Sequence, residues 1–90
     1  MSFSDALLQN AQAVLQLCRE HNWMIATAES CTGGLIAGCL TEIAGSSDVV
    51  DRGFITYSNA AKQTMLGVTE EMLIVHGAVS EPVARAMAKG

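Results

Sequence analysis

A largely apolar run at residues 23–28 constrains the fold of this 90-residue chain more than any other feature. It lacks the regular polar alternation of a half-exposed strand, which is typical of a strand buried in an α/β sheet. The segments on either side of it carry apolar side chains at three- and four-residue steps, as amphipathic helices do. The stripe of the first helix comprises Leu7, Ala11, Val14 and Cys18. The chain is therefore predicted to alternate helices with strands.

Capping and turn residues divide the chain into predicted elements. The predicted helices run from residue 4 or 5 to about 21, from about 32 to 44, from 58 or 59 to 66, from 69 to 76, and onward from about 80. The predicted strands cover residues 23–28 and 49–57, and a short third strand is considered at residues 78 and 79. Gly53, inside the second strand, predicts a bulge or a close approach of another segment.

These elements predict an α/β fold with helices layered around a small, mainly parallel sheet. Two or three strands are few for an independently stable sheet. We therefore expect a single domain over residues 1–90 that is incomplete at its C-terminal end. A half-domain leaves apolar sheet and helix surface exposed, which predicts self-association into a homo-oligomer.

Composition and charge exclude several functional classes. Five Lys and Arg residues stand against nine Asp and Glu, for a net charge of −4 without a basic cluster. Binding to nucleic acid is therefore not expected. No apolar stretch approaches the roughly 18 to 20 residues of a membrane span, and the N-terminus lacks the features of a signal peptide. We expect a cytoplasmic protein with no membrane partner.

The spacing of cysteines and histidines argues against a disulfide framework or a metal site. The chain has three cysteines, an odd number, and no C-x-x-C pair. Cys18 and Cys39 lie on apolar helical faces, where free thiols usually pack. His21 and His76 are isolated in the sequence and are expected at helix ends. We expect no metal and no cofactor.

The junction between the first predicted strand and the second helix, residues 27–34, gathers chemically reactive groups. A strand-to-helix junction presents backbone N–H groups and the positive end of the helix dipole. A nucleophile held there, Ser30 or Cys31, can attack a carbonyl while N–H groups hold the oxyanion. The same geometry can instead hold a phosphate. Ser30 and Thr32 are equally plausible as ordinary helix caps.

Other residues of this junction allow more than one interpretation. Glu29 can orient the nucleophile, bind a ligand hydroxyl or pair with Arg52. The glycine pair Gly33-Gly34 matches neither G-x-G-x-x-G nor the G-x-x-x-x-G-K-[ST] phosphate loop. Nucleotide binding by those two devices is therefore not predicted.

A second polar group follows the second predicted strand. Tyr57 ends that strand, and Lys62 falls in the first turn of the next helix. The positive end of the helix dipole and a desolvating pocket favour a neutral lysine, which can act as a general base, as in serine–lysine hydrolases. If the two strands are parallel neighbours, Ser30 and Tyr57 lie at one edge of the sheet, with Lys62 nearby. However, such a lysine is more often a solvated surface residue, and Ser46 is by default an ordinary turn residue.

Several motifs follow one another over nearly the whole chain. They are TAESCTGG at residues 27–34, IAGSS at 43–47, RGFITYSN at 52–59, Lys62, and HGAVSE at 76–81. In this order they resemble the CinA C-terminal domain family, whose members include nicotinamide-nucleotide amidohydrolases. The resemblance implies a metal-free serine–lysine amidohydrolase of pyridine-nucleotide recycling. Its substrate would be nicotinamide mononucleotide, which it would convert with water to nicotinic acid mononucleotide and ammonia.

The resemblance also implies roles for individual residues. Ser30, Ser46, Tyr57 and Lys62 fall on the family's polar site, with Lys62 as the candidate base. Ser30 is preferred as the nucleophile, Ser46 is the main alternative and Cys31 is the third. Tyr57 would donate a proton to the leaving ammonia or position Lys62. The candidate substrate-binding residues are Glu29, Cys31, Thr32, Gly33 and Gly34, the last three through backbone N–H groups.

The chain differs from the family pattern in length. The family's domain is usually longer, and its later half carries a serine- and glycine-rich loop with an Ala-Gly-Pro element that does not occur in these 90 residues. If that half completes the site, the chain alone lacks the activity. A non-catalytic ligand-binding or assembly module is therefore the alternative function.

Overall fold

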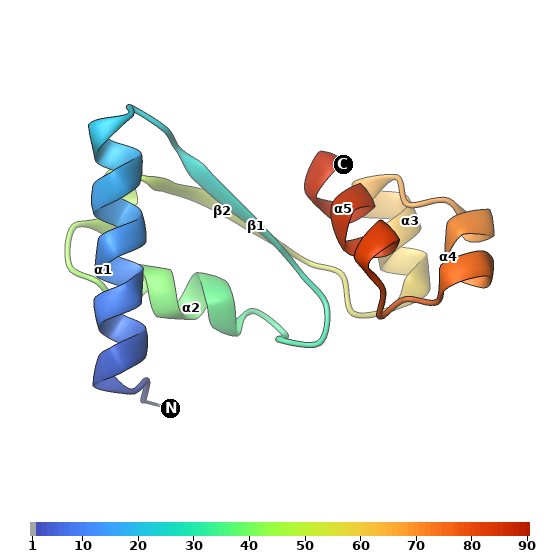
Figure 1. Ribbon diagram of the computed structural model, residues 1–90, viewed down its shortest axis with the longest axis horizontal. Helices are drawn as coiled ribbons and strands as arrows, with labels where there is room; N and C mark the ends of the chain where they lie inside the picture. The colour runs from blue at the N-terminus through green and yellow to red at the C-terminus, as the bar shows by residue number, and fades with distance from the viewer. Residues whose placement is uncertain (1) are drawn as a thin grey trace. The chain divides into compact units, whose positions relative to one another are not determined.

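The computed structural model describes residues 2–90, which form five α-helices, a short 3₁₀ helix and a two-stranded sheet (Figure 1). The elements are α1 (Asp5–Glu20), β1 (Ile25–Glu29), α2 (Leu35–Thr41), η1 (Ser46–Asp48), β2 (Val50–Ile55), α3 (Asn59–Leu66), α4 (Glu70–His76) and α5 (Glu81–Lys89). The chain forms two compact units. The first unit comprises the described residues up to Thr27 together with Gly34–Gly53, and the second comprises Ala28–Gly33 and Phe54–Gly90.

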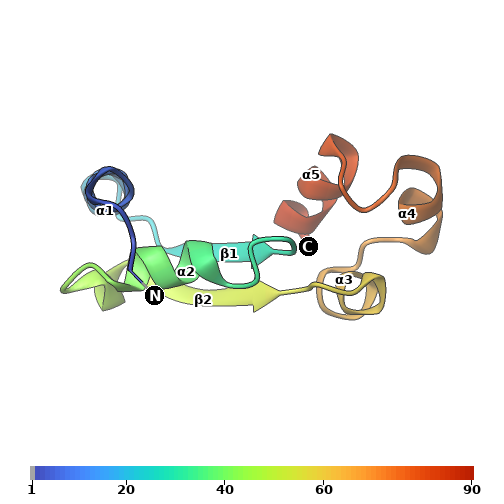
Figure 2. The ribbon, with the colours of Figure 1, turned by 90° about the horizontal axis from the view of Figure 1, so that it is seen from below.

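The two strands are parallel neighbours, and their arrows point the same way in Figure 2. At one end of the pair, the Ile25 N–H donates to the Val49 carbonyl at 2.8 Å. At the other end, the Thr56 N–H donates to the Glu29 carbonyl at 2.7 Å. A parallel pair requires a crossover connection, which α2 and η1 provide. The predicted α/β fold with a small parallel sheet is confirmed.

The first strand starts at Ile25 rather than at residue 23, because Trp23 takes part in the end of α1. The Trp23 N–H donates to the Cys18 carbonyl at 2.8 Å, and the Trp23 ring stacks on His21 with ring centroids 4.5 Å apart. His21 is the C-cap of α1, which confirms its predicted place at a helix end.

The core of the first unit lies between its two helices and the start of β2. It consists of Ala11 and Leu15 of α1, Leu40 of α2, and Val49. The predicted cap of α1 is confirmed, because the Ser4 hydroxyl accepts the Leu7 N–H at 3.2 Å.

The second helix is shorter than predicted at both ends. Gly33 and Gly34 have φ values of +61° and +104°, outside the right-handed helical region, so α2 cannot begin at Thr32. Gly34 is the N-cap and no side chain caps it. The interpretation of Ser30 or Thr32 as the helix cap is therefore wrong. At the other end, the helix stops at Thr41 and the chain turns through Gly45, whose φ is +79°.

Gly53 marks a close approach, which is one of its two predicted roles. A Cβ atom at this position would lie 2.6 Å from Thr27 Oγ1 and 3.4 Å from the Cβ of Ala37. The first distance is shorter than real Cβ contacts, so the site requires a residue without a side chain.

The core of the second unit is formed by α3, α4, α5 and the segment between α3 and α4. Its buried members are Leu66, Val68, Leu73, Val83 and Met87. Ala28 of β1 and Phe54 of β2 pack against this cluster. The ends of both strands are thereby anchored on one hydrophobic core.

The three helix starts predicted in the second unit are confirmed. Ser58 accepts the Ala61 N–H at 3.0 Å, Thr69 accepts the Met72 N–H at 3.1 Å, and Ser80 accepts the Val83 N–H at 3.4 Å. Among residues 2–90, no helix combines the length and apolar character that crossing a membrane requires.

The third strand considered at residues 78 and 79 is wrong. These residues form a bend between α4 and α5. The Ser80 hydroxyl donates to the Gly77 carbonyl at 2.8 Å while it caps α5. This local hydrogen bond folds the segment back on itself, so that it cannot extend as a strand.

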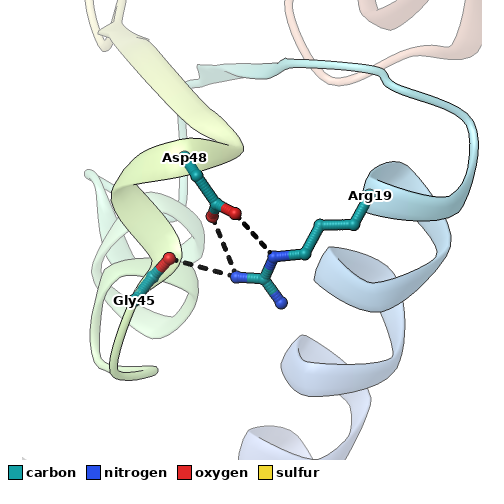
Figure 3. Close-up of polar contacts among 3 residues, drawn as sticks. All are labelled: Arg19, Gly45 and Asp48. Atoms are coloured by element: carbon teal, nitrogen blue, oxygen red, sulfur yellow. Dashed lines mark hydrogen bonds and ion pairs between the residues drawn. The ribbon is translucent and has the colours of Figure 1, made fainter.

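An arginine at the end of α1 holds the turn that contains η1 (Figure 3). Arg19 Nε and Nη2 donate to the two carboxylate oxygens of Asp48 at 2.8 and 2.9 Å, and Nη2 also donates to the Gly45 carbonyl at 3.1 Å. The hydrogen bond from Arg19 holds the pKa of Asp48 below its usual value, although desolvation of the carboxyl opposes this effect. The fork geometry of a guanidinium suits this three-bond clamp.

We expect Asp48→Asn to remove part of the acid sensitivity of folding. Because the folded-state pKa of Asp48 is lowered, its contribution to stability is fully present above the unfolded-state pKa of about 3.9 and is lost as the pH falls through the folded-state value. Thermal unfolding measured from about pH 7 down to about pH 2.5 checks this expectation. The control Asp51→Asn removes a carboxylate whose partner is its sequence neighbour Arg52. Equal acid sensitivity in Asp48→Asn and the wild type would contradict the prediction.

Candidate active site

The strand ends that carry the predicted site residues are hydrogen-bonded to each other. The Glu29 carbonyl accepts the Thr56 N–H at 2.7 Å and the Thr56 hydroxyl at 3.3 Å. Ser30 and Tyr57 are the residues that follow this pair. The predicted convergence of the two strand ends is therefore confirmed for these two positions.

Ser30 begins a tight turn that the structure holds in two ways. The Gly33 N–H donates to the Ser30 carbonyl at 3.0 Å. The Thr32 hydroxyl donates to Glu29 Oε1 at 2.8 Å. The Glu29 side chain is only 1% exposed, so this bond ends on a buried carboxyl group. Because the Gly33 N–H is used within the turn, its predicted role toward an oxyanion or phosphate is not supported by this conformation.

A cleft of about 520 Å³ opens beside this turn, within the second unit. The turn contributes Ser30, Cys31 and Thr32 to it, together with Ala28 and Glu29 at the end of β1. The opposite wall comes from the bend before α5 and from α5 itself: Ala78, Val79, Ser80, Glu81, Ala84 and Met87. Most of the residues predicted to bind substrate therefore line one hollow together with the preferred nucleophile.

The first unit contains a different hollow, an apolar groove of about 400 Å³ between α1 and α2. Its lining is almost entirely hydrophobic: Phe3, Leu7, Asn10, Ala11, Val14, Leu35, Ile36, Cys39 and Leu40. None of the predicted site residues lies in it. The cleft of the second unit, which is lined by predicted site residues, is therefore the better candidate for an active site.

Lys62 is buried, contrary to the usual expectation of a solvated surface lysine. It lies in the first part of α3 and is 1% exposed. Its Nζ donates to the Tyr57 carbonyl at 3.0 Å. Tyr57 itself presents its side chain to solvent, with 74% exposed. The structure therefore brings Lys62 and the Tyr57 backbone together, and it leaves the Tyr57 phenol exposed to solvent rather than in the lining of the cleft.

The alternative nucleophile Ser46 lies in the first unit. It begins η1 and is 6% exposed, whereas the neighbouring Ser47 is exposed. The Ser46 carbonyl accepts the Val49 N–H at 3.0 Å. Ser47 was not singled out from the sequence, because a pair of adjacent serines in a turn gives no signal of which hydroxyl faces solvent.

Thr56 is a second residue that the sequence analysis missed. It is fully buried and supplies both donors to the Glu29 carbonyl. The available signal was a polar residue between the apolar pair Phe54-Ile55, which ends β2, and Tyr57.

The three thiols differ in their surroundings. Cys31, in the turn after Ser30, is exposed, whereas Cys18 and Cys39 are half-buried in the first unit. Within residues 2–90, no three His, Cys, Asp or Glu side chains are grouped as a metal site requires. Arg52 pairs with Asp51, whereas the sequence analysis considered Glu29 as its partner.

Two curated relatives show what the chain is similar to. A CinA-like protein from Syntrophobacter fumaroxidans is 72% identical over 72 residues, which are 80% of this chain and 17% of that protein. The nicotinamide-nucleotide amidohydrolase PncC of Escherichia coli K12 is 54% identical over 84 residues, which are 93% of this chain and 51% of that protein. The chain therefore spans about half, or less, of the length of these relatives.

Solved structures agree with this relationship. The competence/damage inducible protein CihA from Agrobacterium tumefaciens has a TM-score of 0.95 and 53% identity, covering 100% of this chain and 55% of that one. The competence damage-inducible protein A from Klebsiella pneumoniae has a TM-score of 0.89 and 37% identity, covering 93% and 52%. Residues 7–90 match the family described as CinA C-terminal domain. The chain belongs to the CinA C-terminal domain family.

Proposed function

We propose that this chain supplies the reactive residues of a nicotinamide-nucleotide amidohydrolase. The reaction converts nicotinamide mononucleotide and water to nicotinic acid mononucleotide and ammonia. The relative named for this activity, PncC of Escherichia coli, is 54% identical over 93% of the chain. The observation that carries the proposal is the hydrogen-bonded pair of strand ends, since one leads into Ser30 beside an open cleft and the other into Tyr57 and buried Lys62.

The first half of the reaction is acyl transfer to Ser30. Lys62 acts as the general base that accepts the hydroxyl proton, and Ser30 Oγ forms a bond to the carboxamide carbon of the nicotinamide ring. The electron pair of the C=O bond moves onto oxygen. The N–H groups of Cys31 and Thr32, which follow the nucleophile in the turn, are the proposed donors to this oxyanion.

The second half of the reaction releases the two products. The C–N bond breaks, and its nitrogen leaves as ammonia with a proton from Lys62 or Tyr57. Water then attacks the acyl ester and its proton passes to Lys62, which returns a proton to Ser30 Oγ as the ester bond breaks and the carboxylic acid is freed. Ser46 and Cys31 are the alternative nucleophiles in the same scheme.

Serine variants identify the nucleophile. We expect Ser30→Ala to lower the kcat of ammonia release by at least about 100-fold, because the covalent step is lost. Ser46→Ala and Ser47→Ala, the second at an exposed position, serve as matched controls. Their kcat for ammonia release should stay within a few-fold of the wild-type value. Full activity in Ser30→Ala with loss in Ser46→Ala or Ser47→Ala would instead assign the nucleophile to η1. A folded wild-type chain that releases no ammonia would favour the non-catalytic binding or assembly module.

The role of Lys62 is best tested with Lys62→Met, which keeps a long unbranched side chain in the buried position. We expect kcat to fall by at least about 100-fold, because the proton acceptor is lost. The free energy of unfolding should change by no more than about 1 kcal/mol. In contrast, Lys62→Ala should cost about 2–4 kcal/mol, because it leaves a cavity. Urea unfolding beside the ammonia assay separates the two effects, and an active Lys62→Met would exclude Lys62 as the base.

We also propose that the chain associates with copies of itself. Large apolar side chains are exposed in the first unit at Leu17 and Trp23, and in the second unit at Ile74 and Val79, the last 86% exposed. Burial of such surface stabilises association. Sedimentation velocity should therefore detect dimers or larger species, and a monomer over the whole concentration range would contradict the proposal.

A further inference from the structure

The turn that carries Ser30 is closed by a side-chain bond that the proposed reaction does not use. The Thr32 hydroxyl donates to Glu29 Oε1 at 2.8 Å, so that Ser30 and Cys31 lie between the two bonded residues. The Gly33 N–H to Ser30 carbonyl bond, 3.0 Å long, overlaps this closure. Two interlocked hydrogen bonds therefore restrict the backbone on both sides of Ser30.

The acceptor of the Thr32 bond is itself held in place. The Glu29 side chain is 1% exposed. The Glu29 carbonyl accepts both donors of buried Thr56, which is joined in sequence to Tyr57. A group fixed to the Glu29 carboxyl is therefore fixed relative to the strand end that leads to Tyr57 and Lys62.

The Thr32 side chain neither caps a helix nor packs in a core. It does not cap α2, whose N-cap is Gly34. It is exposed, so its methyl group contributes little to a core. What the side chain contributes to the turn is its hydroxyl.

We propose that Thr32 is a positioning residue whose hydroxyl, through the Glu29 carboxyl group, holds the Ser30 turn in its reactive conformation. The inference rests on the proposed function in taking Ser30 as the nucleophile. Precise placement of a nucleophile is worth a large factor in rate, since a misplacement of about 1 Å can cost about 100-fold. Loss of the bond therefore acts on kcat rather than on substrate binding.

The experiment compares Thr32→Val, which removes the hydroxyl at similar volume, with Thr32→Ser, which keeps it. The control Thr41→Val makes the same substitution at an exposed threonine whose hydroxyl donates to the Ala37 carbonyl at 2.9 Å. The first readout is solvent exchange of the Gly33 amide, measured by NMR on the 90-residue chain. The second is kcat and KM for ammonia release from nicotinamide mononucleotide.

We expect Thr32→Val to speed exchange of the Gly33 amide by about fivefold or more and to lower kcat by about 10- to 100-fold with little change in KM. Thr41→Val should behave as the wild type in both readouts, and Thr32→Ser, which keeps the hydroxyl, should restore most of the kcat and of the slow exchange that Thr32→Val loses. Unchanged exchange in Thr32→Val, or equal effects of Val and Ser at position 32, would overturn the proposal. So would faster exchange with an unchanged kcat.

The exchange readout does not depend on enzymatic activity. If the wild-type chain releases no ammonia, the proposed function fails, whereas the exchange rates of the Val and Ser variants still decide whether the hydroxyl holds the turn.

Discussion

The backbone pairing between Glu29 and Thr56 is the interaction on which the rest of the structure depends. Through one carbonyl that accepts two donors, it joins strand ends that are 27 residues apart in sequence. Ala28 and Phe54, just before these ends, pack on the core of the second unit. Ser30 follows one of these anchored ends in sequence, and Tyr57 and Lys62 follow the other. Loss of the pairing would separate the Ser30 turn from the segment that carries Tyr57 and Lys62.

The candidate site also depends on polar side chains that are buried. Glu29, Thr56 and Lys62 are each at most 1% exposed, and each has a hydrogen-bond partner. Desolvated polar groups are costly unless they are paired, and paired ones restrict the conformations available to their neighbours. Ser30 and Tyr57 stand next to these buried groups but remain open to a cleft or to solvent. A reactive surface supported by a rigid buried layer suits catalysis that depends on placement.

The helices were largely predictable from the sequence, and the reasons are local. Ser4, Ser58, Thr69 and Ser80 each cap a helix by a bond to the N–H three residues ahead. The predictions for the start of α2 and for a strand at residues 78 and 79 were wrong, because an unusual backbone angle or a competing local hydrogen bond outweighed the sequence pattern. Positive φ values at Gly33 and Gly34 delayed the start of α2. The bond between Ser80 and the Gly77 carbonyl bent a segment that had been considered as a strand.

The sequence by itself determined the order of the elements, their caps, the family and the residue types available for chemistry. These depend on neighbours within a few positions or on motifs that can be read directly. Only the tertiary structure decided that Lys62 is buried, that Thr56 secures the strand ends, and that Ser46 and Ser47 differ in exposure. Burial and long-range pairing are properties of segments that meet after folding, so the position of a polar residue in a turn or at a helix start does not encode whether water will reach it.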